Sequence, residues 1–112
     1  MTEPLAPDAT ALDIAAAVAA GGVTAVAVAE AALERIERLD ARYNAFTAVT
    51  RERALAQAEA IDRRRAQGEA LPPLAGVPYA VKNLFDVRGL ATLAGSRLNA
   101  QRAPAADDAA LV

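Results

Sequence analysis

A single lysine stands out among the residues of this sequence that could do chemistry. Twelve of the 112 residues are basic, and Lys82 is the one that is not arginine. It lies in an apolar run, VPYAVKNLF, over residues 77–85. Arginine stays protonated in a protein whatever surrounds it, whereas lysine can lose its proton where burial penalises the charged ammonium. The placement therefore indicates an amine that could act as a base.

The other reactive residue types narrow this chemistry. The sequence has no cysteine and no histidine, which excludes disulfides, a cysteine nucleophile, a Cys/His zinc site and a Ser-His-Asp triad built from this chain alone. Ser96 is the only serine. The stretch Gly95-Ser96-Arg97 lacks the second glycine of a nucleophile elbow, so we interpret Ser96 as structural.

Simpler roles also exist for the polar residues of this segment. A lone lysine beside a strand is usually a surface residue whose stem packs while its head stays in water, so two interpretations of Lys82 remain open here. Asp86 could orient a neighbour or bond backbone N–H groups in its own turn, and we favour the backbone bonds. Gly76 and Lys82 do not form a phosphate-binding loop, because no glycine directly precedes the lysine and no serine or threonine follows it.

Three helices are predicted upstream of the lysine. Thr10 begins a short alanine-rich helix to about residue 20, where Gly21-Gly22 ends it by taking the left-handed cap. Thr24 begins a second helix, to about residue 39 or 40, and Thr50 begins a third, to about residue 67. Apolar residues at helical spacing predict the buried faces, which are Val26, Ala29, Leu33 and Ile36 in the second helix and Ala54, Leu55, Ala58 and Ile61 in the third.

The pattern changes to strand and loop after Pro72-Pro73, which forbid further helix. Residues 77–81 are predicted to form a short strand, with Pro78 near its start, where a strand tolerates proline. Asp107-Asp108 are predicted to cap a helix that begins before Val112. Because a helix nucleus of one turn is unstable alone, we expect this sequence to be the N-terminal part of a longer natural protein.

Two stretches around the lysine, PLAGVPYAVKN over residues 73–83 and FDVRGLATLAGS over residues 85–96, resemble the N-terminal part of the amidase signature family. The family pattern is Pro-Leu-x-Gly-[Ile/Val]-Pro-x-x-[Ile/Val]-Lys-Asp, followed by Gly-x-x-Thr-x-x-Gly-Ser. The lysine, the glycines and the Thr/Gly/Ser group match. Asn83 departs from the pattern, since the family usually has aspartate there. Within the family, the sequences NLFD (residues 83–86) and LAGS (residues 93–96) are most similar to those of the carboxybiuret and related ureide amidases.

The resemblance implies an α/β fold, a mixed β-sheet covered by helices. In this interpretation residues 1–112 are the N-terminal part of a single amidase domain. Residues 1–72 form its mainly helical region, with three helices, and residues 73–112 start the α/β core with its first strand and the lysine. The resemblance also implies a Ser–cis-Ser–Lys triad in which Lys82 is the catalytic base. The two serines belong to a Gly/Ser-rich segment beyond residue 112, so the chain alone should be inactive. No cofactor and no metal are implied.

The implied reaction is hydrolysis of a linear carbon–nitrogen bond in a small amide or ureide. Two alternatives remain, the catalytic subunit of a tRNA amidotransferase and a non-catalytic helical module that binds a partner. The substrate is not readable, because the residues that select it lie mostly beyond residue 112. For quaternary structure, the family suggests a homodimer through the N-terminal helices or a small accessory subunit.

Charge and hydropathy argue against several other classes of protein. The sequence has twelve basic and fourteen acidic residues, so it lacks the basic excess of a nucleic-acid binder. We interpret Arg63-Arg64-Arg65 as the solvated end of a helix. Residues 14–29 carry no charge, but the stretch is too short, is rich in alanine and is broken by Gly21-Gly22, so no membrane segment is predicted. Residues 1–4 lack the positive region of a signal peptide. We therefore expect a soluble, cytoplasmic protein, which the absence of cysteine also fits.

Overall fold

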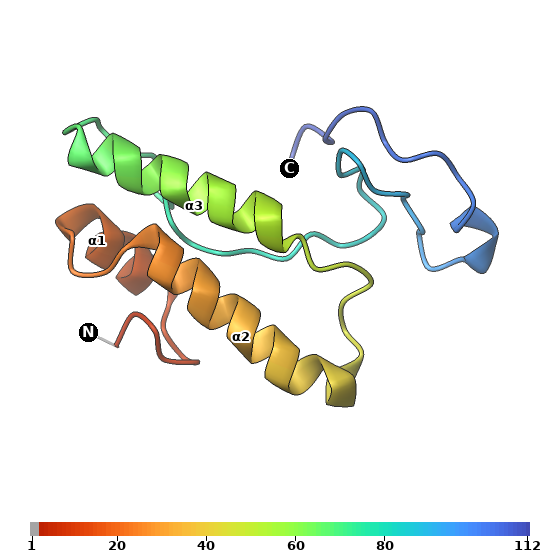
Figure 1. Cartoon of the computed structure of the whole chain (residues 1–112), viewed down its shortest axis with the longest axis horizontal. Helices are drawn as coiled ribbons and strands as arrows, with labels where there is room; N and C mark the ends of the chain where they lie inside the picture. Colours follow the sequence, from red (N-terminus) through yellow and green to blue (C-terminus); the bar gives the residue numbers. More distant parts are fainter. Residues whose placement is uncertain (1–2) are drawn as a thin grey trace. The chain divides into compact units, whose positions relative to one another are not determined.

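The computed structural model describes residues 3–112; Met1 and Thr2, which open the stretch where no signal peptide is predicted, lie outside the described residues. The elements are the helices α1 (Ala11–Ala20), α2 (Ala25–Tyr43) and α3 (Arg51–Ala66) and the 3₁₀ helix η1 (Arg97–Asn99) (Figure 1). The chain divides into two compact units, Met1–Pro78 and Tyr79–Val112. The three α-helices belong to the first unit and η1 to the second.

Local capping sets both ends of α1, as the sequence predicts. The Thr10 hydroxyl accepts a hydrogen bond from the Asp13 backbone N–H at 3.1 Å, which satisfies a donor that has no partner inside the helix. At the other end, Gly21 adopts φ 76°, a left-handed conformation that glycine takes without a Cβ penalty. Its N–H donates to the carbonyls of Ala17 and Val18, and this closes the helix.

A carboxylate from α3 completes the N-terminus of α2. The Thr24 hydroxyl accepts from the Ala27 N–H at 3.0 Å, which is the predicted local cap. The two preceding N–H groups, those of Ala25 and Val26, donate to the two carboxylate oxygens of Asp62 at 2.8 and 3.1 Å. Asp62 lies in α3, which packs side by side with α2 (Figure 1). One side chain therefore caps α2 and also ties the two helices together.

The cap predicted at the start of α3 needs a correction. Thr50 is the N-cap residue, but its side chain makes no capping hydrogen bond, and its backbone lies at φ −90° and ψ 58°. An N-cap residue normally has an extended backbone, and its side chain accepts a hydrogen bond from an N–H group two or three residues further along the chain. The observed conformation is not extended, so the helix begins where the sequence predicts but without this bond.

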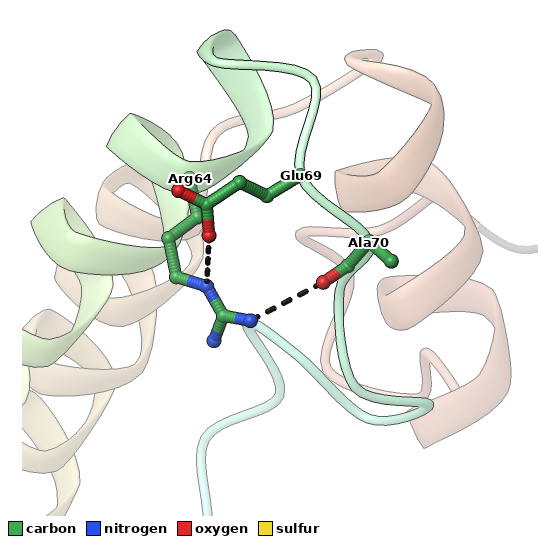
Figure 2. A network of polar contacts seen from close by, with 3 residues as sticks. All are labelled: Arg64, Glu69 and Ala70. Atoms are coloured by element: carbon green, nitrogen blue, oxygen red, sulfur yellow. Dashed lines mark hydrogen bonds and ion pairs between the residues drawn. The ribbon is translucent and has the colours of Figure 1, made fainter.

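The triple arginine at the end of α3 is less solvated than the sequence suggests. Arg63 is exposed, whereas Arg64 and Arg65 are half-buried. Figure 2 shows the Arg64 guanidinium between two acceptors, the Glu69 carboxylate at 3.1 Å and the Ala70 carbonyl at 3.2 Å. These bonds tie the loop that follows α3 back onto the helix. The interpretation as a solvated helix end therefore describes Arg63 and is corrected for Arg64.

Small side chains make up the core of the first unit. Val18 is fully buried, and the other buried residues of this unit are Ala15, Ala25, Val28, Ala29, Leu33, Ala58 and Ala75. On α2 this includes two residues of the predicted face, while Val26 and Ile36 are half-buried. Gly76 packs directly on the core at φ 83°, where an added Cβ would lie 2.9 Å from Cγ2 of Val18. Both the conformation and the close contact explain why this position holds glycine.

The strand predicted over residues 77–81 does not form, and neither does the helix predicted from Asp107. Between residues 3 and 112 the only strand-like pairing is an isolated parallel bridge between Arg88 and Ala105. A strand needs a neighbour for its N–H and C=O groups, and no segment in this range pairs with residues 77–81. Asp108 does not cap a helix, because its carboxylate accepts from the Arg88 N–H at 2.8 Å. The described part of the chain is thus helical and irregular, without the β-sheet of the expected α/β fold.

None of the helices between residues 3 and 112 has the length and apolar character needed to cross a bilayer.

Candidate functional site

Lys82 lies in an irregular segment near the start of the second unit. Its backbone carbonyl accepts from the N–H groups of Leu84 at 2.8 Å and Phe85 at 3.1 Å, so the chain turns directly after the lysine. The side chain is exposed. Within residues 3–112 its ammonium makes no hydrogen bond and no ion pair. The amine is therefore not held by a partner, and the chain's own residues do not enclose it.

Asn83 anchors this turn to the residues that precede Gly95. Its backbone carbonyl accepts from the Ala94 N–H at 2.8 Å, and its side-chain oxygen accepts from the Leu93 N–H at 3.2 Å. Ala94 adopts φ 47°, a left-handed conformation that is costly for a residue with a Cβ. Asn83 thus holds the segment that carries the Gly-Ser part of the motif against the segment that carries the lysine.

Asp86 makes a second link between the same two segments. Its carboxylate accepts a hydrogen bond from the Thr92 hydroxyl, and its backbone carbonyl accepts from the Ala109 N–H at 2.9 Å. The preference for backbone N–H partners in its own turn is therefore wrong, since the carboxylate bonds a side chain six residues away. The glycine-containing turn between them reverses the chain and brings the hydroxyl within reach, with Gly89 at φ 86°.

Ser96 makes a structural contact. Its hydroxyl accepts from the Leu98 N–H at 3.2 Å and caps η1. In the same turn, the side-chain amide of Asn99 donates to the Leu93 carbonyl at 2.9 Å. Ser96 therefore helps to form the turn that follows the Thr-x-x-Gly group, which fits its interpretation as a structural residue.

Further hydrogen bonds of the second unit close a loop from residue 79 to residue 112. The Tyr79 hydroxyl donates to the Val112 carbonyl at 3.0 Å. The N–H of Gly89 donates to the Ala105 carbonyl at 2.9 Å, and the Ala105 N–H donates to the Leu90 carbonyl at 2.9 Å. This arrangement holds the backbone around the lysine through side-chain and turn hydrogen bonds, and it leaves the amine available.

Four large apolar side chains of the same unit are exposed. Tyr79 is 63% exposed, Leu84 48%, Leu98 91% and Leu111 62%. The apolar run that singled out the lysine in the sequence thus provides neighbours for the amine, but no burial within residues 3–112. Any withdrawal of the ammonium from water requires groups other than those the structure describes.

Sequence reasoning finds the lysine but misses the residues that support it. In the sequence, Asn83 stands out only as a departure from a pattern, and Thr92 only as a match to one. The available signal is general: asparagine and aspartate in glycine-containing loops tend to bond nearby backbone groups. That tendency favours a polar contact but does not identify these partners, because the bond from Leu93 to Asn83 spans ten residues and the bond from Thr92 to Asp86 spans six. Both contacts depend on how the loop folds.

Comparison with known proteins places these residues in a family. A family model described as Amidase matches residues 27–112, which include the lysine segment and every contact of the second unit given above. The chain belongs to the amidase family. The matched region begins inside α2, so most of the helical unit is also part of the family match.

Among curated relatives of this amidase chain, AtzE of Pseudomonas sp. (strain ADP), a 1-carboxybiuret hydrolase subunit, is 55% identical over 101 residues. That alignment covers 90% of this chain and 22% of the relative. A glutamyl-tRNA(Gln) amidotransferase subunit of Streptomyces coelicolor is 53% identical over 89 residues, which covers 80% of this chain and 18% of the relative. The chain thus spans about a fifth of the length of these relatives.

Solved structures agree with the sequence comparison. One, described as "An unexpected vestigial protein complex reveals the evolutionary origins of an s-triazine catabolic enzyme", superposes with a TM-score of 0.89 at 53% identity. An inhibitor-bound complex with the same description gives a TM-score of 0.88 at 53% identity. Each match covers 90% of this chain and 22% of the solved chain. The fold of these residues is therefore that of an amidase-family segment.

Proposed function

We propose that these residues form the lysine-bearing segment of an amidohydrolase that cleaves a linear carbon–nitrogen bond, with Lys82 as the catalytic base. Family membership over residues 27–112 supports the reaction class. The match of the lysine to the family motif supports the assignment of Lys82 as the base. Among residues 3–112 the amine of Lys82 has no ion-pair partner, which is compatible with this role, because a base must not be locked in an ion pair. The mixed α/β sheet of the family is proposed for the complete protein.

The mechanism requires groups that this chain does not contain. Neutral Lys82 would take the hydroxyl proton of a nucleophilic serine through a bridging serine, while the serine oxygen bonds the substrate carbonyl carbon. The carbon–nitrogen bond then breaks, and the proton passes from the lysine to the leaving nitrogen. Water, deprotonated by the same amine, releases the acid from the acyl-enzyme. Ser96 caps η1 and is the only serine here, so both catalytic serines would come from outside these 112 residues, and the chain alone would be inactive.

The observation that carries a specific substrate class is the 55% identity to a 1-carboxybiuret hydrolase subunit over 90% of this chain. A ureide of this kind, with adjacent amide bonds and a carboxylate, is the substrate we propose first. The natural full-length protein should release ammonia from 1-carboxybiuret, and Lys82→Ala should lower that rate by about 10²–10⁴-fold, the contribution of a positioned base.

Two further variants make this test specific for a base. Lys82→Arg keeps a positive charge that does not dissociate, so it should be as inactive as Lys82→Ala. Arg102→Ala removes an exposed cation of the same unit and should leave the rate unchanged. Turnover at the wild-type rate in Lys82→Ala would remove Lys82 from the mechanism.

A second candidate is the catalytic subunit of a tRNA amidotransferase, favoured by the 53% identity to a subunit of glutamyl-tRNA(Gln) amidotransferase. The two functions share the base and differ in the ammonia acceptor and in the partners. Coexpression with the two other amidotransferase subunits, followed by a glutaminase assay, separates them. Glutamine hydrolysis that needs those subunits would favour the second candidate over a free-standing ureide amidase.

The complete protein is proposed to work with a small accessory subunit, because one solved relative is described as a protein complex and another relative is named as one subunit of a hydrolase. A homodimer through α1 and α2 is the alternative arrangement. Size-exclusion chromatography with light scattering, on the protein expressed with and without its genomic neighbours, distinguishes the two. We also propose a cytoplasmic location and no direct contact with nucleic acid or membrane, which fractionation of native cells would test.

A non-catalytic binding module is the remaining alternative. It requires the isolated 112-residue chain to fold and bind a partner on its own. A disordered circular dichroism spectrum of that chain would eliminate it and would agree with an amidase segment that leaves apolar surface uncovered.

A further inference from the structure

We infer that Thr92 and Asp86 form a positioning pair for Lys82, an inference that rests on the proposed function. The ammonium has no partner between residues 3 and 112, so its location depends on its own backbone. On the N-terminal side, residues 77–81 pair with no neighbouring strand. There the Tyr79 hydroxyl bond to the Val112 carbonyl is one anchor. The closer anchors lie on the C-terminal side, where residues 83 and 86 are both tied to the segment 92–94.

The turn that follows the lysine has two ends, and Asp86 is the far one. The carbonyl of Lys82 accepts the N–H groups of Leu84 and Phe85, which makes residues 82–85 one tight unit. Asp86 follows directly and is held on two sides, by the Thr92 hydroxyl on its carboxylate and by the Ala109 N–H on its carbonyl at 2.9 Å. Asn83 holds the near end of the turn and Asp86 holds the far end, so a shift of Asp86 would strain the turn and change the direction in which the lysine is presented.

The chemistry of the pair assigns the roles of donor and acceptor. An ionised carboxylate can only accept, so the Thr92 hydroxyl must donate. Hydrogen bonds to a charged acceptor are shorter and stronger than neutral ones. The link from Asn83 to Ala94 runs between backbone atoms and survives any side-chain change, whereas the link from Asp86 to Thr92 is lost when one hydroxyl is removed. Thr92 is thus a position where the support of the lysine can be weakened by removing one hydroxyl, without altering the backbone pattern.

The pair acts through the backbone and does not touch the reacting atoms. Its effect is on the location of the amine relative to the serine it must deprotonate. A displacement of about 1 Å at a reacting group can cost about 10²-fold in rate. Loss of the Thr92 hydroxyl should therefore slow the activation of the serine while leaving the binding of a ligand unchanged.

The test uses the natural full-length protein and a fluorophosphonate probe, which phosphonylates an activated serine, releases fluoride and needs no knowledge of the substrate. The maximal labelling rate, kinact, reports serine activation, and the half-saturating concentration, KI, reports binding. Thr92→Val removes the hydroxyl and keeps the shape, and Thr92→Ser restores the hydroxyl. Thr10→Val is the matched control, since it removes one hydroxyl that also makes one hydrogen bond, in the first unit.

We expect Thr92→Val to lower kinact about tenfold or more with KI unchanged, and Thr92→Ser to recover most of the loss. Thr10→Val should leave both constants near the wild-type values. Asp86→Asn keeps a neutral acceptor in the same shape and should give an intermediate kinact, which also provides the test if Thr92→Val does not fold. An unchanged kinact in Thr92→Val, or a Thr92→Ser variant as slow as Thr92→Val, would overturn the proposed positioning role of Thr92 and Asp86.

Lys82→Ala in the same assay keeps this inference separate from the proposed function. Labelling that persists at the wild-type rate in Lys82→Ala would remove the lysine from the mechanism and the pair with it. Labelling that is lost in Lys82→Ala but normal in both Thr92→Val and Asp86→Asn would overturn only the positioning pair.

Discussion

The contact between Asp62 and the start of α2 gives the sharpest prediction about stability. Three consecutive N–H groups at this helix end have no partner within the helix. Thr24 satisfies the third of them, and the carboxylate of Asp62 satisfies the first two, at 2.8 and 3.1 Å. Replacing Asp62 by alanine removes both acceptors at once and also removes a negative charge from the positive end of the helix dipole.

The magnitude follows from the bonds that are lost. A hydrogen bond to a charged group contributes about 1.5–3 kcal/mol, and an anion at a helix N-terminus about 0.3–1 kcal/mol more. The two bonds share one carboxylate, and the site is half-buried, so water replaces part of the loss and the contributions do not simply add. We expect Asp62→Ala to cost about 3 kcal/mol locally, which is roughly a hundredfold change in the opening equilibrium.

Hydrogen exchange measured by mass spectrometry on the full-length protein reads this change where it occurs. Peptides that cover the first turn of α2 should exchange about a hundredfold faster in Asp62→Ala and about tenfold faster in Asp62→Asn, which keeps one neutral acceptor. Glu59→Ala is the matched control on the same helix, because its ion pair with Arg63 is exposed and spans 3.9 Å. Such pairs contribute at most about 1 kcal/mol.

Two outcomes would refute the reasoning about Asp62. Exchange at the start of α2 could stay at the wild-type rate in Asp62→Ala, which would mean that water or another group caps the helix equally well. Alternatively, Glu59→Ala could accelerate exchange as much as Asp62→Ala, which would mean that any charge lost from α3 has the same effect.

Further predictions concern glycine and threonine positions. Gly76→Ala should destabilise by about 3 kcal/mol, because strain at φ 83° adds to a 2.9 Å contact with Val18. Gly89→Ala, at φ 86° with open space, should cost only the strain of about 1–2 kcal/mol. Equal falls in Tm for the two variants would contradict this. Thr24→Ala should cost about 1 kcal/mol, whereas Thr50→Ala should stay within about 0.5 kcal/mol, since Thr50 makes no capping bond. The reverse order in thermal denaturation would show that the caps are misassigned.

The parts of the fold that the sequence predicts are those decided within a few residues. Thr10 and Thr24 bond N–H groups three residues ahead, and Gly21 ends its helix through its own backbone conformation. The cap from Asp62 could not be predicted in this way, because the donor and the acceptor are 37 and 36 residues apart and meet only when α2 packs on α3. Long-range contacts of this kind depend on the tertiary fold.

The wrong prediction of a strand over residues 77–81 has the same origin. Apolar β-branched residues and a proline near the start describe a chain that is able to enter a sheet. Whether it does so depends on a neighbour that supplies the ladder, and residues 3–112 contain none. The helix predicted at Asp107-Asp108 does not form, and the Asp108 carboxylate accepts a hydrogen bond from the backbone N–H of Arg88, 20 residues away.

The candidate site combines both situations. Lys82 can be selected from the sequence as a candidate, because its residue type and its motif are local, and its role as the base stays a prediction. The residues that support it cannot be selected in this way, because Asn83, Asp86 and Thr92 act through contacts that bring residues 82–86 against residues 92–94. The second unit has no helix of more than three residues and no sheet among its described residues. Hydrogen bonds of individual polar side chains therefore fix its backbone, where a helix or a sheet would use repeated backbone hydrogen bonds. Substitutions that remove a single hydroxyl or amide should therefore matter more for the placement of the lysine than substitutions of the exposed apolar residues around it.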